Sequence, residues 1–263
     1  MSNNANHWRR NALHGTPIQR TNYCETCRTE AAGAIGASEV FWSPDGQRLS
    51  HTVHGGPGAT TDSACKVFLL RSDPKQGNPI VQFTFPDSSL HDYDPSWSGR
   101  GTDISYGRDD FRILRKGVAG VNSDTLDYLV TASGDHVSHG DLTPAISPDG
   151  EWVAFGRKDQ PSGRYNLWKI SLYGDQSTLL QLTNTTNVVD FYPRWSPDGN
   201  WITFDRQIGP STAEHHVYKV KSNGDSLQAV YNAPSGKDAA TPGFSSDGQI
   251  ITAGIGTHDA VTR

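Results

Sequence analysis

The chain has 263 residues and a net charge of −5, with 34% hydrophobic and 10% aromatic residues. This length can fill one sizeable core, and all-β folds often reach it as a single domain. An acidic chain without Lys/Arg runs is not suited to sequence-independent binding of nucleic acid or anionic membranes, and it has no apolar run approaching the roughly 18 residues that a membrane span needs.

The first 37 residues precede a repeated pattern that occupies the rest of the chain. They begin without the apolar stretch of a secretory signal, although a mature chain whose signal has been removed is an alternative. Cys24 and Cys27 form a CxxC, but Arg28 follows where covalent haem attachment needs a histidine, and there is no second CxxC for zinc. We therefore expect a local disulfide or thiols here, and no cofactor.

A turn motif recurs five times, with its serine at Ser43, Ser98, Ser147, Ser196 and Ser245. Three copies read Ser-Pro-Asp-Gly, the second reads Ser-Gly-Arg-Gly and the fifth Ser-Ser-Asp-Gly. Proline presets the first central position of a type I turn, and glycine takes the left-handed position that follows. Because apolar residues alternate with polar ones after each glycine, each copy is predicted to be a β-hairpin.

Two further strand-like segments follow each of the first four hairpins, with third strands near 66–70, 111–114, 166–170 and 216–220 and fourth strands near 80–83, 128–130, 179–182 and 228–231. Four short strands per unit at a near-constant period are typical of β-propeller blades. The sequence therefore predicts a single all-β propeller domain over residues 1–263. The hairpins of this domain are expected at 38–53, 92–108, 141–157, 190–206 and 239–255.

The fifth copy is cut short after its hairpin, because only 18 residues follow Ser245. The segments around Trp8–Arg10 and Pro17–Thr21 have the spacing of third and fourth strands. We expect them to complete the last blade, so that a five-bladed ring is closed by strands from the N- and C-terminal segments. A six-bladed ring, of which this chain is a piece, is the alternative.

The repeat resembles that of TolB-type propellers, which are WD40-like rings that carry a Pro-Asp signature. The resemblance rests on residues 190–204, Asp-Phe-Tyr-Pro-Arg-Trp-Ser-Pro-Asp-Gly-Asn-Trp-Ile-Thr-Phe, and on related copies at 92–98 and 141–150, and it extends over about 38–256. It implies a propeller and, through the scaffold members of the group, a periplasmic or extracellular protein that binds a protein partner. The group also contains propellers that gate prolyl oligopeptidases and some polysaccharide lyases.

Charged residues occur in pairs at two positions of the hairpin. The sixth residue before the serine is Asp92, Asp141 or Asp190, and the tenth after it is Arg108, Arg157 or Arg206; in the first and fifth copies both positions are apolar. This covariation predicts direct cross-strand contact at the hairpin end opposite the turn. The pairs are expected either to fix the strand register or to form an anion site at the mouth of the central channel.

Histidine and tyrosine residues are the other candidates for a binding face at this end of the hairpins. His91, His136 and His139 precede the second and third hairpins, and Tyr93 and Tyr192 lie at hairpin starts. We predict a non-enzymatic scaffold that presents these residues to a protein partner, without a metal. Carbohydrate binding, suited to exposed aromatic rings, and a metal-dependent lyase with histidine ligands are the alternatives.

Overall fold

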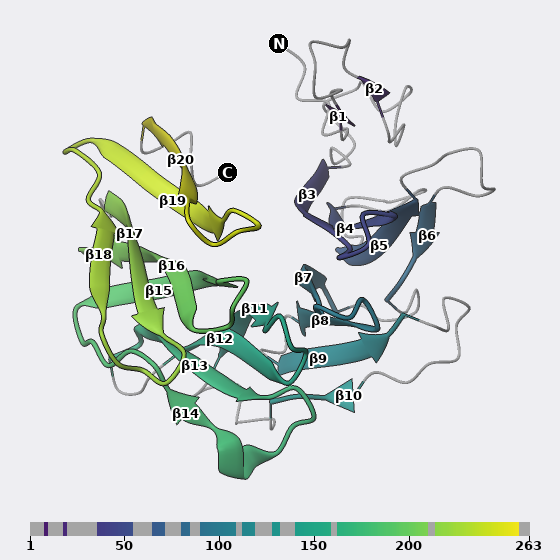
Figure 1. The fold of residues 1–263 in the computed structure, drawn as a ribbon, viewed down its shortest axis with the longest axis horizontal. Coiled ribbons are helices and arrows are strands. Elements are labelled where there is room, and N and C mark those ends of the chain that lie inside the picture. Colours follow the sequence, from purple (N-terminus) through teal and green to yellow (C-terminus); the bar gives the residue numbers. More distant parts are fainter. Residues whose placement is uncertain are drawn as a thin grey trace. The chain divides into compact units, whose positions relative to one another are not determined.

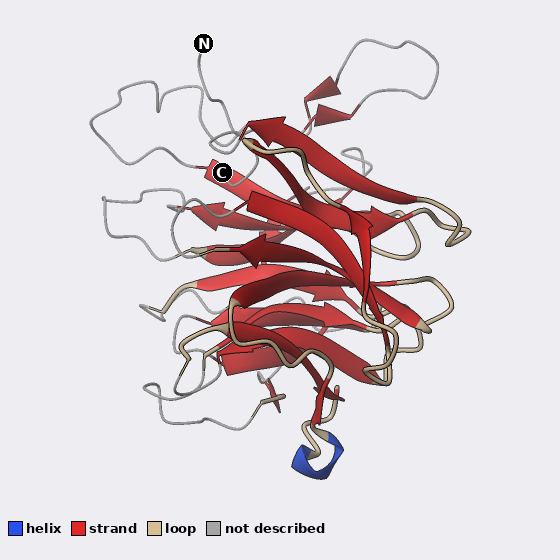
Figure 2. Cartoon of the chain, turned by 90° about the vertical axis from the view of Figure 1, so that its left-hand side faces the viewer, coloured by secondary structure: helices blue, strands red, loops and turns tan. Residues whose placement is uncertain are grey.

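The computed structural model describes residues 8–9, 18–19, 36–54, 65–71, 80–84, 90–108, 112–118, 128–131, 140–158, 162–209 and 214–257. Within these ranges the chain is all-β, with a single 3-10 turn, η1 (Gln176–Thr178), as Figure 2 shows. No helix in the described part of the chain is long and apolar enough to cross a membrane.

The strands form antiparallel sheets in which strands adjacent in sequence lie side by side (Figure 1). Sheet 1 contains β3 (Gly36–Trp42), β4 (Arg48–His54), β5 (Lys66–Arg71) and β6 (Ile80–Gln82), and sheet 2 contains β7 (Asp92–Trp97), β8 (Asp103–Arg108), β9 (Arg112–Gly117) and β10 (Tyr128–Leu129). Sheet 3 contains β11 (Asp141–Ile146), β12 (Trp152–Lys158), β13 (Tyr165–Ser171) and β14 (Leu180–Gln181). Sheet 4 contains β15 (Val188–Trp195), β16 (Trp201–Ile208), β17 (Glu214–Lys221) and β18 (Gln228–Tyr231). Sheet 5 contains β19 (Lys237–Phe244) and β20 (Ile251–Thr257), and β1 (Trp8–Arg9) pairs with β2 (Ile18–Gln19).

These sheets coincide with the units expected from the repeat. Each hairpin begins within two residues of its expected position, and the third and fourth strands of sheets 1 to 4 lie where the apolar segments placed them. The chain divides into two compact units, residues 1–95 with 120–125 and residues 96–119 with 126–263. In the second unit β11 contacts both β8 and β15, and β19 contacts β15, β16 and β17, so consecutive sheets of this unit pack on one another.

The turn motif closes the hairpins through its serine and its glycine. In sheet 4 the N–H of Trp201 donates to Ser196 Oγ at 2.9 Å, and the N–H of Gly199 donates to Ser196 O at 2.9 Å. Gly199 has φ +70°, a left-handed conformation that glycine adopts without steric cost. Equivalent hydrogen bonds to the serine hydroxyl recur in the other four hairpins. Each copy of the sequence motif therefore closes one hairpin of the fold.

A second backbone irregularity recurs four residues before the turn serine. There, residues other than glycine have positive φ values of 52–54°: Asp94, Thr143, Tyr192 and Thr241. In sheets 3, 4 and 5 this residue lies within a β-bulge, where the register of the first strand of the hairpin shifts against the second. A left-handed threonine or tyrosine is strained by about 1–3 kcal/mol, so the surrounding sheet must hold it in place.

The core lies between the sheets and is built from the alternating residues that follow each turn. In sheets 3 and 4 these are Val153, Phe155, Ile202 and Phe204, all inaccessible to solvent. They pack with residues of the third strands, such as Ile170 and Val220, in two apolar clusters. The equivalent Ile251 and Ala253 of sheet 5 are only half-buried.

Candidate functional site

Two of the charge pairs expected at the hairpin end opposite the turn are bidentate ion pairs. In sheet 3, Arg157 Nε donates to Asp141 Oδ1 at 2.7 Å and Arg157 Nη2 to Asp141 Oδ2 at 2.8 Å. In sheet 4, Arg206 makes the same two bonds to Asp190 at the same distances. The residues of each pair lie opposite each other in the strand register, as the covariation predicted.

Both pairs are buried, and each arginine lies over aromatic rings. The guanidinium carbon of Arg206 lies 4.5 Å from the centroid of the Tyr218 ring and 5.4 Å from that of Phe204. Arg157 lies similarly over Phe155 and Trp168. A guanidinium enclosed by two rings and a carboxylate is well suited to fixing the strand ends.

Asp92, in the first unit, has a partner that the sequence pattern did not predict. Lys66 Nζ, from β5, donates to Asp92 Oδ2 at 3.2 Å and to Leu90 O at 2.7 Å, and both charged side chains are buried. The N–H of Cys65 donates to Nδ1 of the half-buried His91 at 3.1 Å. These bonds hold the start of β7 against the third strand of sheet 1.

For the remaining predicted site residues the structure gives burial and few contacts, or does not describe them. Arg108 is half-buried, with its guanidinium carbon 5.8 Å from the centroid of the Tyr106 ring. Tyr93 is half-buried on β7. His136 and His139 lie outside the described residues, as do Cys24 and Cys27.

A titratable cluster that the sequence reasoning missed lies at the same hairpin end of sheet 4. His215 Nδ1, on β17, is 2.8 Å from Asp205 Oδ1 on β16, and the backbone N–H of His215 donates to Asp238 Oδ1 on β19 at 3.0 Å. Both carboxyl groups are buried. The cluster thus connects sheet 4 to the first strand of sheet 5. Its signal in the sequence was an aspartate at 205, where the second, third and fifth copies of the repeat have glycine.

The surroundings shift the pKa values of both partners. Burial raises the pKa of the Asp205 carboxyl above its usual value, and the hydrogen bond with His215 offsets part of this rise. Burial alone would lower the pKa of His215, but the hydrogen bond with Asp205, together with the charges of Asp205 and Asp238, raises it above its ordinary 6.5. The hydrogen bond with Asp205 and the charges of Asp205 and Asp238 therefore favour the protonated form of the His215 imidazole.

Three aromatic rings lie together at this end of sheets 3 and 4, and we call them the aromatic cluster: Tyr165, Phe191 and Tyr192. The ring centroids of Tyr165 and Phe191 are 4.8 Å apart, those of Phe191 and Tyr192 are 6.1 Å apart, and all three residues are half-buried. The N–H of Tyr192 donates to Thr143 Oγ1 at 3.3 Å, which connects the two bulges. Burial, and secondly the charge of Asp141, raises the pKa of Tyr165, so its hydroxyl stays protonated.

Among the described residues, no three or more His, Cys, Asp or Glu side chains are arranged to hold a metal ion. The described part of this hairpin end thus contains ion-paired strand ends and half-buried aromatic residues.

No family model and no curated protein matches the sequence. Solved structures do match its fold. A TolB-like protein from Agrobacterium tumefaciens is similar with a TM-score of 0.67 at 19% identity, over 92% of this chain and 79% of that one. TolB from Acinetobacter baumannii matches with a TM-score of 0.61 at 14% identity, over 94% of this chain and 56% of that one. An oligogalacturonate lyase from Vibrio parahaemolyticus matches with a TM-score of 0.63 at 11% identity, over 97% of this chain and 66% of that one.

Proposed function

Given the TolB-type β-propeller fold of this chain, we propose that it is a non-enzymatic binding module that presents one end of its hairpins to a protein partner. The observation that carries this proposal is the aromatic cluster. The three residues are half-buried. Phe191 and Tyr192 lie on β15, whose end is fixed by the buried Asp190–Arg206 pair, and Tyr165 lies on β13, next to the strand that carries Arg157. Rigidly held tyrosine and phenylalanine side chains are typical centres of protein interfaces, because they bury a large area at little cost in conformational entropy.

The Asp–Arg pairs would hold the strands of this surface in place and would not contact the partner directly, because their hydrogen-bonding capacity is largely used within the pair. We propose that the other predicted site residues contribute to partner binding as well. These are Asp92, Tyr93, Arg108, His91, His136 and His139, together with the paired Asp141, Arg157, Asp190 and Arg206.

Native purification of the full chain from its source cells, followed by a binding assay with the purified partner, tests this function. We expect one partner to co-purify and Tyr192→Ala to weaken its binding at least about ten-fold, the effect of removing a central interface ring. Tyr173→Ala is the matched control, because Tyr173 is a well-exposed residue in the turn after β13, outside the cluster, and it should leave the affinity within about two-fold. Recovery of the chain alone, or equal binding by Y192A and wild type, would contradict the proposal.

We also propose that the segment containing β1 and β2 completes sheet 5 and closes a five-bladed ring. Among the described residues β20 pairs only with β19, and β20 carries no charge. Such an uncharged, unpaired edge favours the addition of a strand.

Hydrogen exchange on the chain with and without residues 1–20 tests the closure. We expect the amides of β20 to lose protection in the shortened chain while those of β16 keep it, because only β20 would lose a neighbour. Unchanged protection of β20 would favour the six-bladed alternative.

The lyase alternative has one supporting observation, the structural similarity to an oligogalacturonate lyase. It requires His91, His136 and His139 to share a metal, and metal analysis of the purified protein tests it. Nδ1 of His91 already accepts a backbone N–H, which leaves Nε2 as its only nitrogen for a metal. The TolB-type fold also supports a periplasmic or extracellular location, which cell fractionation during the native purification would test.

A further inference from the structure

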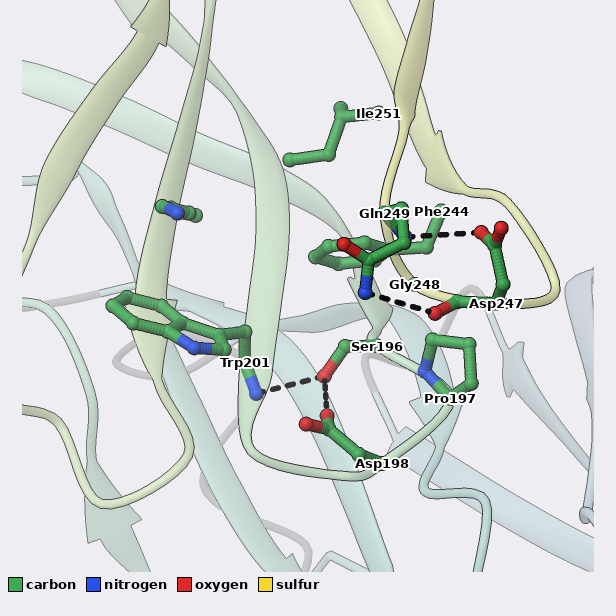
Figure 3. Close-up of a pocket in the computed structure, with 10 residues that line it drawn as sticks. Ser196, Pro197, Asp198, Trp201, Phe244, Asp247, Gly248, Gln249 and Ile251 are labelled. Carbon is green, nitrogen blue, oxygen red and sulfur yellow. Dashed lines mark hydrogen bonds between the residues drawn. The ribbon is translucent and has the colours of Figure 1, made fainter.

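A groove of about 500 Å³ lies between the turn of β15–β16 and the turn of β19–β20. Trp201, Phe244 and Ile251 give it apolar walls, and Asp198, Asp247 and Gln249 give it a polar rim (Figure 3). Its volume lies within the range of small-ligand sites. The groove lies at the turn end of the hairpins, whereas the aromatic cluster lies at the other end.

The turn sequences explain why the groove is open. Between sheets 2 and 3 the turns touch through Gly99, where an added Cβ would overlap the backbone of Pro148. In sheet 4 the position of Gly99 in the motif holds Pro197. The Pro197 ring lies next to Gly248 of the following turn, where an added Cβ would come only to ordinary van der Waals distance of the ring. Two turns separated by a proline ring cannot approach as closely as two that meet at a glycine.

Two carboxylates, Asp198 and Asp247, lie on the rim of the groove. The hydrogen bond from Ser196, followed by the N–H of Asn200, lowers the pKa of Asp198. Ser245 and the N–H of Gln249 do the same for Asp247. The cation in the lining, Lys219, has its Nζ 4.4 Å from the centroid of the Trp201 ring. Two carboxylates thus belong to the lining, together with one ammonium group, Lys219, and a second ammonium group, Lys221, has its Nζ 5.8 Å from the centroid of the same indole ring. Both lysines are already placed over the indole, whereas the lining residues include no arginine to pair with the carboxylates.

The same chain shows what fits between two such turns. Between sheets 2 and 3, Arg100 Nη2 donates to Glu151 Oε1 at 3.3 Å, so that an arginine side chain joins one turn to the next. The positions of these residues in the motif are occupied by Asp198 and Gln249 in sheets 4 and 5. There the pair of turns has no arginine of its own and has a carboxylate in its place.

We infer that this groove binds an arginine side chain of a partner protein, with an apolar residue next to that arginine packed on Trp201, Phe244 and Ile251. The guanidinium would lie between the turns, as that of Arg100 does between sheets 2 and 3, and would neutralise Asp198 and Asp247. This inference goes beyond the proposed function, since it concerns the opposite end of the hairpins and needs none of the aromatic cluster.

N-acetyl-phenylalanyl-arginine amide is the probe, observed by the NMR signal of the Trp201 indole N–H, which W201F identifies. We expect a saturable shift of this signal. The citrulline peptide, which has the same shape without the charge, should bind about five-fold more weakly, the effect expected from losing one exposed charge interaction. Because this comparison uses the wild-type protein only, it does not depend on how well a variant folds.

Substitutions of Asp198 and Asp247 test whether these two carboxylates bind the guanidinium. D198N/D247N should weaken the arginine peptide about ten-fold, while D149N, which changes the same turn position in sheet 3, should leave it unchanged. Y192A should also bind the peptide normally, which separates this site from the proposed partner surface. Equal binding of the citrulline peptide, an equal loss in D149N, or a response of the Trp201 signal to a neutral oligosaccharide but not to the arginine peptide would overturn the inference.

Discussion

Replacing Arg206 with alanine is expected to lower the free energy of unfolding by about 3–5 kcal/mol, the usual loss when one partner of a buried ion pair is removed. Asp190 is inaccessible to solvent and receives two hydrogen bonds from Arg206. Without the guanidinium, this carboxylate must stay charged in an apolar environment, take up a proton or admit water. Urea unfolding at pH 7 measures the loss.

Two comparisons separate the buried charge from general effects of losing an arginine. Arg100→Ala removes the exposed pair with Glu151, which should cost no more than about 1 kcal/mol. Asp190→Leu combined with Arg206→Met replaces both members of the buried pair by apolar side chains, and it should recover most of the stability lost in R206A. A loss in R206A no larger than that in R100A would show that the Asp190–Arg206 pair does not fix the strand ends.

His215→Gln is expected to make the protein less stable at low pH and to have little effect at high pH. Because the pKa of His215 is higher in the folded protein than its ordinary 6.5, the folded state binds the proton more tightly than the unfolded state. The stability that His215 contributes is thus complete below pH 6.5 and is lost as the pH rises through the raised value. Asp205 acts in the same direction at lower pH, because its raised pKa favours the folded state only while its carboxyl is protonated.

Urea unfolding of both proteins between pH 5.5 and pH 9 tests this. We expect H215Q to be about 1.5–3 kcal/mol less stable at pH 5.5, the contribution of a hydrogen bond to a charged group, and the difference to shrink towards pH 9. A double-mutant cycle with Asp205→Asn assigns the effect to the pair, because the coupling should be present at pH 5.5 and small at pH 9. A difference that stays constant with pH would mean that His215 stabilises sheet 4 by packing alone.

Much of the fold follows from the sequence, because the turn motif determines local geometry that does not depend on distant contacts. In all five turns the glycine N–H bonds to the serine carbonyl, and in four of them the serine hydroxyl also bonds to the aspartate, so hairpins could be placed to within two residues. The Asp–Arg pairs of sheets 3 and 4 were also predictable, since covarying positions inside one hairpin face each other by register. The half-buried Ile251 was less predictable, because its burial depends on which strand follows β20.

Interactions between sheets were the part that the sequence did not reveal. Lys66 and Asp92 are 26 positions apart, and nothing in the period of the repeat connects them. The contact of His215 with Asp238 likewise depends on how sheet 5 lies against sheet 4. The groove depends on Pro197 meeting Gly248 across two turns. Such contacts are set by packing, which a periodic pattern does not specify.

The left-handed residue in each bulge has a consequence for how such a chain can change over generations. The same distortion lies at the same point in the first strand of four successive hairpins, at Asp94, Thr143, Tyr192 and Thr241. Four of the five hairpins therefore carry the same bend at the same position of the motif. Duplication or deletion of one repeat would therefore leave this bend in place in the first strands of the remaining hairpins. Only contacts between neighbouring hairpins, such as the bond from Tyr192 to Thr143, would have to adjust.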